Sequence, residues 1–78
     1  MLLIRLPEVK SYMLQRRTKR TPTDLLMAEV LVPVQINEPF EFQTSSGSEV
    51  FEKFTCQEVA EVYKDGETFY AIKAQGEF

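Results

Sequence analysis

The last third of the chain alternates apolar and polar residues with the period of two that is typical of a β-strand. Two such runs, residues 55–64 and 67–74, meet at Asp65-Gly66. This dipeptide favours a two-residue type I′ turn, because both of its residues must adopt positive φ. The register set by that turn pairs Val62 with Phe69, Ala60 with Ala71, Glu58 with Lys73, Tyr63 with Thr68, Glu61 with Tyr70 and Val59 with Ile72. Apolar residues oppose apolar ones and an acid opposes a base, so we predict a β-hairpin here.

A second hairpin is predicted just upstream. Residues 40–44 alternate, which directs Phe40 and Phe42 inward and leaves Glu41 and Gln43 outward. The Ser- and Gly-rich residues 44–48 form a turn, and residues 49–54 return as the partner strand, continuing or bending into the last hairpin.

The middle of the chain predicts one more strand. Residues 29–36 are apolar at their even positions, and Pro33 cannot donate a ladder hydrogen bond, so this strand is expected at a sheet edge or with a bulge. Asn37-Glu38-Pro39 is the turn that follows. Residues 22–28 admit one short helix, since Thr21-Pro22 resembles a helix start. A loop that leads into a long strand is the favoured alternative.

The N-terminal segment adds two strand candidates. Leu2, Ile4 and Leu6 alternate up to Pro7, which ends the first strand, and residues 10–17 form the second. Residues 1–78 therefore predict one all-β domain of five or six short strands. Closure removes exposed strand edges, which favours a small antiparallel barrel, SH3-like or OB-like. A two-sheet sandwich is the alternative.

The composition argues against catalysis. The chain has no histidine, one cysteine and three glycines, none of them in a phosphate-binding motif. This removes the commonest general base and the commonest metal ligand, so we expect no enzyme, no cofactor and no metal site. Cys56 is expected as a small buried residue. No apolar stretch approaches a membrane span, and the apolar N-terminal run precedes its charges, unlike a signal peptide. We therefore expect a cytoplasmic, intracellular protein.

Charge is divided unevenly along the chain. Residues 1–20 hold six cations and one acid, whereas residues 21–78 hold eleven acids and three lysines. Four of the cations form the basic cluster Arg16, Arg17, Lys19 and Arg20. Such a cluster can bind phosphates, contact acids on a partner, on a second copy or elsewhere in its own chain, or simply remain solvated.

Exposed aromatic residues are a second candidate feature. Tyr63 and Tyr70 flank Glu61 in the hairpin register, and the acid beside them would repel a nucleic-acid backbone. These tyrosines and the basic cluster are therefore the candidate binding residues, for a protein more than for a nucleic acid. The expected function is a small non-enzymatic module that binds another protein, as adaptor, assembly factor or inhibitor, and self-associates. A nucleic-acid-binding barrel that uses the basic cluster is the alternative.

Overall fold

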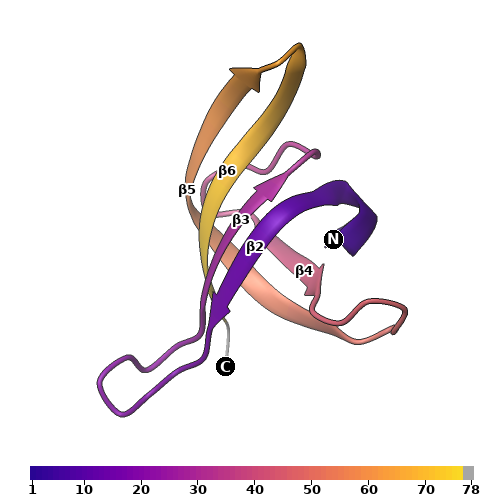
Figure 1. Ribbon diagram of the computed structural model, residues 1–78. Coiled ribbons are helices and arrows are strands. Elements are labelled where there is room, and N and C mark those ends of the chain that lie inside the picture. The colour runs from indigo at the N-terminus through magenta and orange to yellow at the C-terminus, as the bar shows by residue number, and fades with distance from the viewer. Residues whose placement is uncertain (77–78) are drawn as a thin grey trace.

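The computed structural model describes residues 1–76, and these form an all-β domain (Figure 1). The all-β prediction is confirmed. The elements are β1 (Leu2–Ile4), a 3₁₀ turn η1 (Leu6–Glu8), β2 (Val9–Gln15), β3 (Leu25–Val30), β4 (Pro39–Gln43), β5 (Phe51–Lys64) and β6 (Glu67–Gly76). No α-helix forms within residues 1–76, and residues 22–24 are the loop that leads into β3, as the favoured alternative predicted.

The six strands form one sheet in the order β1-β4-β5-β6-β3-β2, curled into a half-barrel (Figure 1). All neighbouring strands are antiparallel except β1 and β4, which are parallel. This pair departs from the antiparallel barrel expected from the sequence. The chain leaves β1 at one edge, passes through η1 and enters β2 at the other edge. Within residues 1–76, β1 and β2 are not paired to each other, so the barrel stays open between them.

The predicted hairpin is β5 and β6, and all six predicted residue pairs are present. Asp65 and Gly66 both have positive φ, 54° and 77°, as a type I′ turn requires. β5 runs on without a break from its pairing with β4 to its pairing with β6. A bulge between Cys56 and Glu58 interrupts its register. Such an extra residue bends a strand and increases its twist, which helps this sheet to curl.

Replacing Gly66 with valine is expected to destabilise the domain by more than about 1 kcal/mol, because a β-branched residue resists positive φ. A Cβ atom at this position would meet nothing within 4 Å, so the expected loss comes from backbone strain and not from a clash at Cβ. Gly66→Asn is the matched control, since asparagine tolerates this region. Urea unfolding measures both variants. A valine variant as stable as the parent would show that this turn does not need positive φ.

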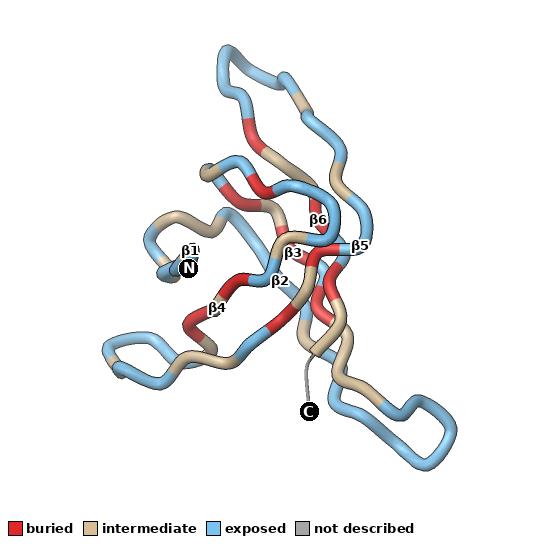
Figure 2. Tube along the Cα trace, turned by 180° about the vertical axis from the view of Figure 1, so that it is seen from behind, coloured by how far each residue is buried: buried red, intermediate tan, exposed pale blue. Residues whose placement is uncertain are grey.

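The core lies inside the curve of the sheet. Its largest fully buried side chains are Phe40, Phe42, Phe54, Ile4, Leu26, Val30 and Cys56. Figure 2 shows buried segments along the middle of the sheet, whereas the β5–β6 turn and the β2–β3 loop are exposed. Cys56 is buried as expected, and burial raises the pKa of its thiol, which makes it a poor nucleophile.

Two local predictions are wrong. Residues 31–36 are not a strand, because β3 ends at Val30. Val34 is still buried and Val32 packs against the core, although their backbone does not join the sheet, whereas Ile36 is exposed. Gln43, expected to point outward, is also buried. Its side chain accepts a hydrogen bond from the Leu6 N–H at 2.8 Å and donates one to the Ser48 carbonyl at 2.7 Å. The amide thereby satisfies two backbone groups that the adjoining loops leave unpaired.

Candidate functional site

The convex outer face of the sheet carries apolar side chains that the core does not use. Cross-strand register places Met13 beside Met27, and Ala71 beside Ala60, on this face. Met13 is 65% exposed and Met27 49% exposed. Ala60 is exposed and Ala71 is half-buried. We call Met13, Met27, Ala60 and Ala71 the outer apolar patch. Exposed methionines that neighbour each other on a sheet are typical of surfaces that adapt to a partner.

Two hollows lie over this patch. The larger holds about 430 Å³ and is lined by Ser11, Tyr12, Met13, Met27, Ala28, Glu29, Ala71 and Ile72. The smaller holds about 230 Å³ and is lined by Met27, Glu58, Val59, Ala60, Ala71, Ile72 and Lys73. They share Met27, Ala71 and Ile72. The short alanine side chains leave this space between longer neighbours. The hollows therefore form one shallow apolar groove that crosses β2, β3, β6 and β5, with charged residues at its rim.

Strand β2 is an open edge beside this groove. Among the described residues it pairs with β3 alone. Residues 10–13 and 15 are exposed. Edge strands are usually protected by charges, prolines or bulges. Here the register shift near Lys10 protects only the start, and residues 11–15 contain no charge, proline or glycine. The centre of β2 is therefore a strand edge that another strand can pair with.

A separate polar hollow lies next to the start of β2. It holds about 330 Å³ and is lined by Lys10, Glu29, Lys64, Asp65, Glu67 and Phe69. The Lys10 ammonium lies 4.6 Å from the centre of the Phe69 ring and forms an ion pair with Glu67. That bond raises the pKa of Lys10. The lysine thus covers a ring that would otherwise be exposed on the outer face, and joins β2 to β6.

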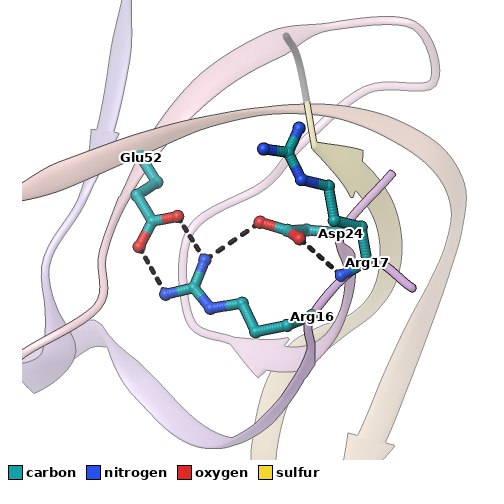
Figure 3. A network of polar contacts seen from close by, with 4 residues as sticks. All are labelled: Arg16, Arg17, Asp24 and Glu52. Carbon is teal, nitrogen blue, oxygen red and sulfur yellow. Dashed lines mark hydrogen bonds and ion pairs between the residues drawn. The ribbon is translucent and has the colours of Figure 1, made fainter. Parts of the chain in front are cut away.

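The basic cluster follows β2, and its first residue is bonded to acids of the same chain (Figure 3). The Arg16 guanidinium donates to both oxygens of Glu52, at 2.6 and 2.9 Å, and to Asp24 at 2.9 Å. The Arg17 backbone N–H donates to the other Asp24 oxygen at 2.8 Å. The paired hydrogen bonds between Arg16 and Glu52 thus link the end of β2 to β5. Arg16 is therefore engaged with acids of its own chain, which is one of the roles expected for a cation here.

Acid is expected to remove the contribution of this network to stability. The hydrogen bond from Arg16 lowers the pKa of Glu52. The hydrogen bond from the Arg17 N–H is the main cause that lowers the pKa of Asp24, and the hydrogen bond from Arg16 lowers it further. A carboxyl whose pKa is lower in the folded state stabilises the fold above its unfolded pKa. That stability is lost as the pH falls through the folded value, here below the ordinary values of 4.5 and 3.8.

Glu52→Gln is expected to cost about 1 kcal/mol at neutral pH and almost nothing well below pH ~4, where the parent carboxyl is itself protonated. Urea unfolding of both proteins across this pH range gives the difference. Glu49→Gln is the control, because Glu49 is 85% exposed and lies 3.7 Å from Arg5. A Glu52→Gln cost that does not change with pH would contradict the role assigned to the ion pair.

The other cations lie in the loop between β2 and β3. Thr18 organises this loop: its hydroxyl accepts hydrogen bonds from the N–H groups of Arg20 and Thr21. Arg17, Lys19 and Arg20 are all exposed. The loop projects from the end of the molecule opposite the β5–β6 turn (Figure 1). The structure therefore places these cations together, beyond the end of the outer apolar patch.

The two tyrosines lie elsewhere. Tyr63 is 76% exposed and lies two residues before the β5–β6 turn. Tyr70 is half-buried and packs against the core cluster. Because the β5–β6 turn and the β2–β3 loop lie at opposite ends, the structure does not join the tyrosines and the basic cluster into one surface (Figures 1 and 2).

The outer apolar patch was missed from the sequence. The sequence did contain a signal, since Met13 and Met27 alternate with the more buried residues of their strands and so lie on the other face of the sheet. Recognising the patch also requires the pairing of β2, β3 and β6, which brings together residues far apart in the chain.

Within residues 1–76, no helix has the length and apolar character needed to cross a membrane. In the same residues, no group of three or more acidic or cysteine side chains is placed to hold a metal ion. Comparisons with protein-family models, curated proteins and solved structures find no match for this chain.

Proposed function

We propose that this protein is a non-enzymatic, intracellular module that binds another protein through the outer apolar patch and the open edge of β2. The observation that carries the proposal is the exposure of Met13 and Met27 over an apolar groove beside the uncharged centre of edge strand β2. A monomer in water gains nothing from this arrangement. A partner that covers it removes apolar surface from water, and this favours association.

The geometry supports recognition of an extended segment. A strand that adds to β2 would form backbone hydrogen bonds along its open edge, as in other cases of β-strand addition. Alternate side chains of that strand would point toward the outer face, next to the groove beside Met13. Methionines supply flexible contacts that adapt to different side chains. Backbone bonds would then give affinity, and the groove would select apolar side chains.

The charge arrangement supports a protein partner over a nucleic acid. Arg16 donates its side-chain hydrogen bonds to two acids of the same chain, and those acids would repel a phosphate backbone beside the cluster. Exposed Tyr63 lies near the end of the molecule opposite the basic loop. The candidate binding residues therefore do not make one phosphate-and-base site.

Affinity capture from the native host, with and without nuclease, tests the proposal. We expect this protein to capture a host protein that can be cross-linked to it directly. Nuclease should leave this capture intact. Met27→Lys should abolish this capture, because it places a charge in the groove. Ile36→Lys, at a residue 56% exposed and outside the groove, should not.

A different result would favour the nucleic-acid alternative. In that case nuclease would abolish capture, and replacing Lys19 and Arg20 with glutamine would abolish an oligonucleotide gel shift at physiological salt. We expect no tight oligonucleotide binding, since two or three engaged cations release few counterions.

A further inference from the structure

We propose that the β2 edge also binds a second copy of this chain, so that two β2 strands pair antiparallel about a two-fold axis. The inference rests on the proposed function in that both use the same edge. It goes further in naming the partner and its orientation. A two-fold contact is isologous, which means that each copy offers the same strand to the other.

The centre of β2 suits pairing with itself. Residues 11–15 bring no like charges together when two copies meet. The cations at either end of this segment already have acidic partners in their own chain. Lys10 pairs with Glu67, and Arg16 pairs with Glu52 and Asp24. Repulsion between the two strands is therefore reduced at both ends.

The charges at the two ends of β2 complement each other across the two-fold axis. The polar hollow at the start of β2 is lined by three acids, Glu29, Asp65 and Glu67, and by two lysines, Lys10 and Lys64, so acids outnumber cations there by one. The end of β2 leads into the loop that carries Arg17, Lys19 and Arg20. Antiparallel pairing brings the basic end of each copy to the acidic end of the other. The same attraction is then made twice, and salt screens it.

Pairing would also extend the apolar surface. Met13 lies on β2, so in the paired strands the Met13 side chains of the two copies would lie near each other at the two-fold axis. The groove that begins at Met13 and Met27 would then continue from one copy to the other as a single apolar surface. The opposite edge, β1, offers only three residues and is a poorer template.

Sedimentation equilibrium of the purified protein over a range of salt concentrations tests this proposal. At low salt the parent should approach the mass of two chains as its concentration rises, and added salt should shift it toward the mass of one. Met13→Lys should raise the dimer dissociation constant by about tenfold or more, because it places like charges near the axis. Val50→Lys is the matched control, since Val50 is 58% exposed and lies outside β2.

A second variant tests the orientation. Lys19→Gln combined with Arg20→Gln should weaken the dimer at low salt and reduce its dependence on salt. A parent protein that stays monomeric at low salt and millimolar concentration would overturn the proposal. So would a dimer that Met13→Lys leaves intact. Neither result affects the proposed function. That function requires only that a host protein be captured through the groove and that Met27→Lys abolish this capture.

Discussion

Phe42→Ala is expected to lower the free energy of unfolding by about 3–5 kcal/mol, a large part of the 5–15 kcal/mol that stabilises a typical domain. The Phe42 side chain is fully buried. Its ring lies edge-on to Tyr12, with centroids 5.2 Å apart, and edge-on to Phe54 at 6.4 Å. Tyr12 is on β2 and Phe42 on β4, two strands that do not pair. The ring therefore packs across the open side of the half-barrel, and its loss leaves a cavity there.

Urea unfolding followed by circular dichroism measures this loss, and Val50→Ala is the control. Val50 is 58% exposed, so its truncation should change stability by less than about 0.5 kcal/mol. If Phe42→Ala is folded too weakly to measure, Phe42→Leu retains an apolar side chain and should lie between it and the parent. A Phe42→Ala protein as stable as the control would contradict the assigned core.

Gln43→Leu is expected to cost about 2 kcal/mol, although leucine is apolar and Gln43 is only 6% exposed. The glutamine side chain bonds the Leu6 N–H and the Ser48 carbonyl. Leucine fills similar space but leaves both backbone groups without these partners in a partly buried setting. The substitution therefore separates hydrogen bonding from burial, because a purely apolar core position would gain from it.

Urea unfolding again gives the value. Glu41→Gln is the control, since Glu41 is a neighbour on the same strand and is less buried. It should change stability by no more than about 0.5 kcal/mol. A Gln43→Leu variant more stable than the parent would show that η1 and the β4–β5 loop do not depend on this amide.

The sequence allowed prediction of the parts of the fold that depend on neighbouring residues. The Asp65-Gly66 turn specifies its own register, so all six pairs of the β5–β6 hairpin followed from local chemistry. Phe40 and Phe42 alternate clearly, and both are buried. Pairings between distant segments carry no comparable local signal. The parallel contact of β1 with β4, some 38 residues apart in the register, was therefore not predicted.

Burial without strand pairing explains the local errors. Val32 and Val34 pack on or in the core, so residues 31–34 alternate although Pro33 lies outside any strand. A pattern of hydrophobic residues reports burial, and a strand is only one way to achieve it. Gln43 is the converse case. Its polar side chain suggests a surface position. Its hydrogen-bond partners, however, lie in η1 and in the β4–β5 loop, and only the folded chain brings these segments together.

The candidate site was only partly predictable for the same reason. The basic cluster is contiguous in the sequence and was found there. The partner of Arg16, Glu52, lies 36 residues away on β5, so its internal ion pair could not be predicted. The outer apolar patch combines residues of β2, β3, β5 and β6, and its methionines look like ordinary core residues until the register is known.

Amide hydrogen exchange along β2 tests the central claim, that this edge is a protein-binding surface, most directly. The measurement is made on the parent protein alone at low concentration and again in its complex with a second copy or a captured partner. We expect slower exchange in the complex at alternate residues of 11–15, those whose N–H groups point away from β3. Unchanged exchange along β2, with new protection confined to the basic loop or the β5–β6 turn, would contradict the claim.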